Sequence, residues 1–150
     1  MKTGNAILGG TVGAGALTII HETLKRVVPG APRMDLLGMM ALSKTLRHFG
    51  KTPPSGRKLF YITMAGDLVS NALFYSIAGA GKKRNAIWKG LSLGFSAGLG
   101  AVLLPKPLHL DPSYSRRTPQ TAVMTIALYT VGGILAGWAI QKLFSKKGEN

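Results

Sequence analysis

Apolar residues along this chain gather in four long blocks, which are separated by segments that hold prolines, glycines and most of the basic residues. A helix needs about 20 mostly apolar residues to cross the hydrocarbon core of a bilayer, and each block has about that length. The pattern therefore predicts four transmembrane helices. We expect them at about 4–24, 58–81, 86–104 and 119–144.

Between the first two predicted spans, residues 35–48 place leucines and methionines at helical spacing. This segment is too short to cross a bilayer, and it contains Lys44, Arg47 and His48. It therefore predicts an amphipathic helix that lies at the membrane interface or folds against the spans. Asp35 is the expected N-cap of this helix.

The predicted fold is all-α: a single integral membrane domain over residues 1–150, with a bundle of four transmembrane helices and one short interfacial helix. The composition agrees, because 46% of the residues are hydrophobic and only 16% are charged. The formal net charge is +14, and basic residues cluster at span ends, as at Lys82, Lys83 and Arg84. We therefore expect contact with the bilayer and its anionic lipid headgroups, and not with nucleic acid. The chain has no cysteine, which excludes disulfides and thiolate metal sites.

Small residues recur along one face of two predicted spans. Gly10 and Gly13 share a face of the first span, and Gly90, Gly94 and Gly98 form a repeated GxxxG series on the third. Small side chains at this spacing let the backbones of neighbouring helices approach closely. We expect these faces to pack helices together and, through them, to form a homo-oligomer or to join a membrane complex.

The second predicted span carries one carboxylate, Asp67, near its middle. A charged carboxylate in hydrocarbon is costly, so an acid at this depth usually turns inward and finds partners. Counting about 1.5 Å per residue from the same membrane side places Thr11, Ser96 and Tyr129 at its level, and Asn71 lies one turn away. We expect these five residues to form a proton or ion site in which Asp67 is protonated or exchanges protons. In the alternative, a neutral Asp67 only locks the bundle through a hydrogen bond.

These polar residues favour a small transporter or channel subunit that is coupled to protons or ions. The alternative is a structural or assembly subunit of a membrane complex with no activity of its own. An enzyme would have to use His21, Glu22, His109 and Asp111, but no spacing of a nucleophile and a base, or of three metal ligands, is present in any one helix. We therefore assign no catalytic residue, no metal and no cofactor.

The expected cellular setting follows from a resemblance and from the charges between spans. A glycine-rich first span followed by the stretch from His21-Glu22 to Pro32-Arg33 is similar to small bacterial membrane proteins, which implies a multi-pass protein of the bacterial inner (cytoplasmic) membrane. Lys and Arg are almost balanced between the two sides of the predicted topology. This leaves a weak bias toward larger loops inside and both termini outside.

Overall fold

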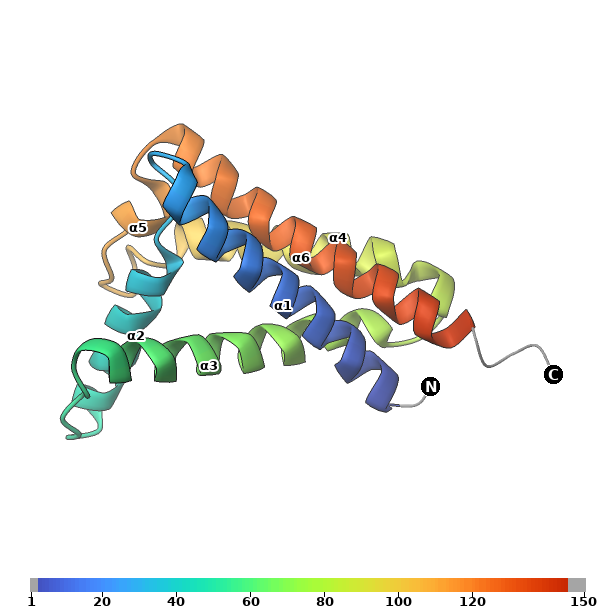
Figure 1. Cartoon of the computed structure of the whole chain (residues 1–150), viewed down its shortest axis with the longest axis horizontal. Helices are drawn as coiled ribbons and strands as arrows, with labels where there is room; N and C mark the ends of the chain where they lie inside the picture. The colour runs from blue at the N-terminus through green and yellow to red at the C-terminus, as the bar shows by residue number, and fades with distance from the viewer. Residues whose placement is uncertain (1–2, 146–150) are drawn as a thin grey trace.

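Figure 1 shows the computed structural model of the chain, which describes residues 3–145. All regular structure in this part of the chain is helical, with a turn of two short 3-10 helices between α3 and α4. The α-helices are α1 (Thr3–Val27), α2 (Met34–His48), α3 (Gly56–Ser76), α4 (Ala86–Leu103), α5 (Ser113–Arg116) and α6 (Pro119–Ser145). The all-α prediction is therefore confirmed for the described residues.

Three of these helices are long and apolar enough to cross a membrane, namely α1, α4 and α6 as far as Lys142. The 21 residues of α3 give about 31 Å of helix, which is also long enough. Asp67 and Asn71 lower the mean hydropathy of α3, however, and this helix is not among the three. By length and composition the described chain therefore has three candidate spans, where we expected four.

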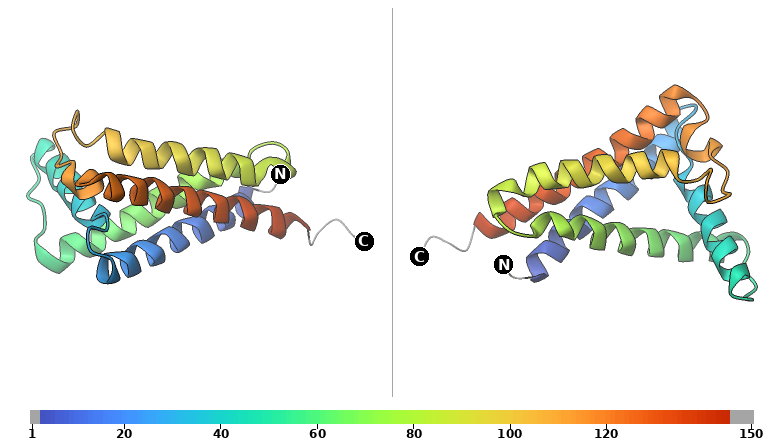
Figure 2. Two further views of the ribbon diagram at one scale, coloured as in Figure 1. Left: turned by 90° about the horizontal axis from the view of Figure 1, so that it is seen from above. Right: turned by 180° about the vertical axis from the view of Figure 1, so that it is seen from behind.

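The four long helices alternate in direction, so the start of α1 and the end of α6 lie at the same end of the molecule (Figure 1). α4 packs along α6, α6 along α1, and α1 along α3. α3 and α4 meet at the turn that joins them and then diverge (Figure 2). The short turn between α3 and α4 thus holds only one end of each helix close to the other.

Close backbone approach at glycines explains this packing order. A Cβ on Gly90 would overlap the carbonyl group of Gly133 on α6, and a Cβ on Gly10 would overlap that of Ala72 on α3. The other glycines that we singled out are crowded in the same way by α6: Gly13, Gly94 and Gly98. These small-residue faces therefore pack against helices of the same chain. They are not free to pack against a second copy of the chain in the way that we expected.

Because α3 and α4 diverge from their shared turn, the space between them has the shape of a wedge. α2 lies across the wide end of this wedge, where the two helices are farthest apart (Figure 1). Hydrogen bonds between segments hold this end together: for example, the Arg33 backbone N–H donates to the Tyr114 carbonyl at 2.7 Å, and the Thr121 hydroxyl donates to the Gly30 carbonyl at 2.8 Å. The N-cap position of α2 belongs to Arg33, and Asp35 lies within the first turn. The expected N-cap role of Asp35 was therefore wrong.

Candidate functional site

The wedge between α3 and α4 contains a groove of about 690 Å³. Most of its lining is apolar, and α2 together with the segment of residues 105–110 closes it at the wide end. Its polar side chains come from α3, α4 and α6: Asp67, Ser70, Asn71, Ser96 and Tyr129. A largely apolar hollow with a few convergent polar groups has the character of a ligand site.

Asp67 lies on the wall of this groove, and its side chain is exposed there. Its carboxylate interacts with the side chain of Asn71, one turn further along α3. It also interacts electrostatically with the side chain of Tyr129 on α6. No Lys, Arg or His lines the groove, and across residues 3–145 Asp67 forms no ion pair. His21 of α1 acts on this carboxylate only through a longer-range electrostatic interaction, so the carboxylate is available to a proton or a cation.

A buried tyrosine, Tyr75, joins α3 to α6 beside the groove. The Tyr75 hydroxyl of α3 donates to the backbone carbonyl of Tyr129 on α6 at 2.8 Å, and the Tyr75 side chain is fully buried. This bond fixes the inner edge of α3 against α6. Asp67 lies about two turns before Tyr75 on the same helix.

Four of the five residues predicted for the site line the groove, and Thr11 does not. The Thr11 hydroxyl donates to the Ile7 carbonyl at 2.9 Å on an exposed face of α1. Beside Asp67, α1 instead presents Thr18 and His21, about two and three turns further along. Counting residues from a common surface assumes parallel helices, but α1 crosses α3 at an angle (Figure 1), so equal counts reach different levels.

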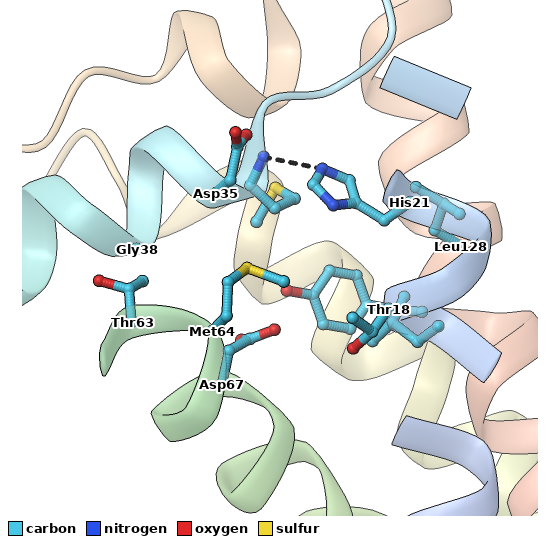
Figure 3. A pocket seen from close by; sticks show the side chains of 11 residues that line it. Thr18, His21, Asp35, Gly38, Thr63, Met64, Asp67 and Leu128 are labelled. Atoms are coloured by element: carbon cyan, nitrogen blue, oxygen red, sulfur yellow. Dashed lines mark hydrogen bonds between the residues drawn. The ribbon is translucent and has the colours of Figure 1, made fainter. Parts of the chain in front are cut away.

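A second, much smaller cavity lies between α1, α2 and α3 (Figure 3). Its volume is about 30 Å³, which suits one or two water molecules. Asp67 and Tyr129 line both this cavity and the groove, so Asp67 lies on the wall between them. Thr63 also lines the cavity; its side chain is 7% exposed, and its hydroxyl has no hydrogen-bond partner. An unpaired buried hydroxyl costs about 1–3 kcal/mol, so a small polar guest in the cavity would be stabilised by it.

His21 lies at the far side of the same cavity, buried near the end of α1 (Figure 3). Its Nε2 atom is 3.1 Å from the Pro32 carbonyl oxygen and 3.3 Å from the backbone nitrogen of Met34. When Nε2 carries the proton it donates to Pro32, and when it does not it accepts from the Met34 N–H. The Nε2 atom of His21 therefore has a hydrogen-bond partner in either neutral tautomer.

A buried cluster of charges fastens the start of α2 to the end of α1. Asp35 is 5% exposed and accepts hydrogen bonds from Lys25 Nζ at 3.0 Å and from two Arg33 nitrogens at 3.1 and 3.0 Å. Lys25 also pairs with Glu22 at 2.6 Å. Burial by itself acts to raise the pKa of Asp35, but the hydrogen bonds from Arg33 and Lys25 outweigh it and lower the pKa to about 2. Asp35 is therefore ionised and paired at neutral pH.

The four residues that an enzyme would have to use lie in two regions: His21 Nδ1 is 3.7 Å from Glu22 Oε1 near the end of α1, whereas His109 and Asp111 lie between α4 and α5. His21 lines the small cavity, whereas His109 lines a separate surface pocket beside α2. Glu22 pairs with basic residues of α1, and the Asp111 carboxylate accepts the backbone N–H of Ser113 at 2.8 Å. Within the described part of the chain, no three His, Asp or Glu side chains are grouped as metal ligands. The geometry thus offers no catalytic constellation at these positions.

No model of a known protein family, no curated protein and no solved structure matches the chain. Sequence analysis placed Asp67 at the centre of the site but left out Thr18, Thr63 and the charge cluster around Asp35. Thr63 is four residues before Asp67 and so shares its helix face, which was a usable signal. The sequence signal for Asp35 was weaker. Asp35 is one of only five acidic residues in the chain, and a basic residue, Arg33, lies two positions before it.

Proposed function

We propose that α3 is a fourth membrane-embedded helix and that the chain is a small transport protein coupled to protons or cations. The outward surface of α3 supports the first part of this proposal. Tyr61, Ile62, Val69 and Leu73 are between 44% and 66% exposed on it. A contiguous apolar surface of this kind suits contact with lipid and not with water.

Basic residues at both ends of α3 suit the same placement. Arg57 and Lys58 are exposed in its first turn, and Lys82 is exposed in the turn that follows it. Such side chains favour anionic lipid headgroups, and they would hold the ends of α3 at the two membrane surfaces. We propose a multi-pass protein of a bacterial inner membrane on this basis and on the sequence resemblance given above.

One observation carries the transport proposal: Asp67 lies on the wall shared by the open groove and the small cavity. A membrane-embedded carboxyl without a basic partner either holds a proton or binds a cation. Exchange of one for the other is the elementary step of coupled transport. The groove gives Asp67 access from the α3–α4 side, and the cavity extends from Asp67 toward His21 and α2.

The test is flux through the purified protein in liposomes that enclose a pH-sensitive dye, under an imposed gradient of protons or of sodium or potassium ions. We expect flux above that of protein-free liposomes and at least a tenfold loss in Asp67→Asn. Asp111→Asn is the matched control, because it removes a carboxylate from a connecting loop outside the long helices. Equal flux from wild type and Asp67→Asn, with both folded, would refute the proposal.

The lateral opening of the groove between α3 and α4 favours one alternative, an assembly subunit that receives part of another membrane protein there. This function requires no flux from the isolated chain. It also predicts that Asp67→Asn releases a partner that co-purifies from native membranes with the wild-type protein. Flux that depends on Asp67 in liposomes containing only this chain would exclude the alternative as the sole function.

A further inference from the structure

We propose that the groove between α3 and α4 binds an organic ammonium ion with a compact apolar body, whose charged group pairs with Asp67. This inference rests on the proposed function, because it names the class of cation for the same site. It follows from the charge of the groove, from its shape and from the occupants that its walls exclude.

The charge of the groove is complementary to a single positive group. Asp67 is its one ionisable acid and, as described above, no basic side chain lines it. Ser70, Asn71 and Ser96 line the same groove and add further oxygen acceptors. An ammonium group, which has only donors, satisfies these acceptors, whereas an anion would meet the carboxylate with nothing to offset the repulsion.

The remaining walls suit an apolar body. Leu37 of α2, Phe74 of α3 and Leu104, directly after α4, line the groove together with small apolar residues. Its volume of about 690 Å³ is within the range of small-molecule sites and far above the need of one inorganic ion. Aromatic faces at Phe74 and Tyr129 also attract a positive charge.

A membrane-spanning helix of another protein does not fit this groove. The lining extends only from Asp67 to Phe74 on α3 and from Ser96 to Leu104 on α4, or about 10 to 12 Å along each helix. A spanning helix needs about 30 Å, and α2 crosses the wide end where it would have to continue. The occupant is therefore compact.

A phospholipid headgroup is disfavoured by charge and by depth. Its phosphate would lie next to Asp67 in a groove without a basic residue. Asp67 is also about 16 Å along α3 from Gly56, so the headgroup would have to leave the interface for the middle of the helix. A free amphiphilic amine carries no phosphate and partitions into lipid, from which the exposed Asp67 and Ser70 can be reached sideways.

Binding is tested with three molecules of one shape and different charge: 1-adamantylamine, 1-adamantanol and 1-adamantanecarboxylate. The full chain is placed in phosphatidylcholine nanodiscs, and binding is measured by equilibrium dialysis against empty nanodiscs, which removes simple partitioning. We expect saturable binding of the amine at least tenfold tighter than that of the alcohol, and none of the carboxylate. In Asp67→Asn the affinity for the amine should fall to that for the alcohol, with the alcohol unchanged.

A second pair of variants keeps the test valid if Asp67→Asn folds poorly. Ala97→Phe fills the groove and should abolish binding of both amine and alcohol, whereas Val69→Phe, on the outward face of α3, should leave both unchanged. Amine binding that survives Asp67→Asn, equal binding of amine and alcohol, or equal effects of the two phenylalanine variants would each overturn the inference.

A further experiment, with phosphatidylethanolamine added to the nanodiscs, distinguishes a lipid headgroup from a free amine as the source of the ammonium group. If phosphatidylethanolamine in the nanodiscs displaces the amine in an Asp67-dependent manner, the natural occupant is a lipid and the inference is overturned. Failure of the proposed function is seen separately, because equilibrium binding needs no flux. Amine binding without any flux would refute transport alone, and Asp67-dependent flux of inorganic cations without amine binding would refute this inference alone.

Discussion

Replacing Gly98 by alanine tests the packing of α4 on α6 most directly. A Cβ at this position would lie 2.7 Å from the Ile126 Cα and 3.0 Å from the Ile126 carbonyl oxygen. Ordinary van der Waals contact begins at 3.4 Å, so the nearer contact is too short by about 0.7 Å. The crowded atoms belong to the backbone of α6 and cannot turn aside, so the two helices must separate. Overpacking of this kind costs about 1–3 kcal/mol.

Gly100→Ala is the matched control, because it makes the same change two residues further along the same helix. A Cβ there would meet only the end of the Leu104 side chain, at an ordinary 3.5 Å. We expect it to be neutral or to stabilise α4 by up to about 1 kcal/mol. Thermal unfolding in detergent, followed by circular dichroism, should then show a Tm for Gly98→Ala several degrees below that of Gly100→Ala. Equal Tm values for the two variants would mean that α4 and α6 are not packed as described.

Two further predictions concern the α2 end of the molecule. The pKa of Asp35 falls from 3.8 to about 2 on folding, so its pairing with Lys25 and Arg33 stabilises the protein above pH 3.8 and this stabilisation is lost as the pH falls toward 2. The difference in unfolding free energy between wild type and Asp35→Asn should therefore vanish over that range. A difference that does not change with pH would contradict the pairing. Thr125→Val leaves the buried Ser115 carbonyl without its 2.7 Å hydrogen bond. This change should lower the free energy of unfolding, measured by chemical denaturation, by about 1–3 kcal/mol. An unchanged denaturation midpoint would show that the hydrogen bond contributes nothing to stability.

The sequence predicts the helices of this protein better than their arrangement. Hydrophobic blocks, prolines and glycines locate all four long helices, because these signals are local to each helix. The glycine series on α4 also marks a real contact surface. Its partner is α6 of the same chain and not a second copy, however, and nothing in a GxxxG pattern distinguishes these two cases.

The site is only partly predictable for a related reason. Asp67, Asn71, Ser96 and Tyr129 are polar residues in apolar blocks, which is a local anomaly that the sequence displays. The choice of Thr11 depended on helix orientation, because a shared depth follows from residue counts only when helices run parallel. The angle between α1 and α3 is set by packing over many residues, and no short segment of sequence encodes it.

The groove and the charge cluster depend on each other through α2. Lys25 and Arg33 hold Asp35 at the end of α1, which fixes the first turn of α2. One turn later, Gly38 lies so close to Thr63 of α3 that a Cβ would come within 2.8 Å of the threonine methyl group. α2 is thus positioned from both sides, and it is α2 that closes the wide end of the groove and bounds the small cavity beside Asp67. The ion pairs that hold Asp35 at the end of α1 therefore also position the helix that bounds both the groove and the small cavity beside Asp67.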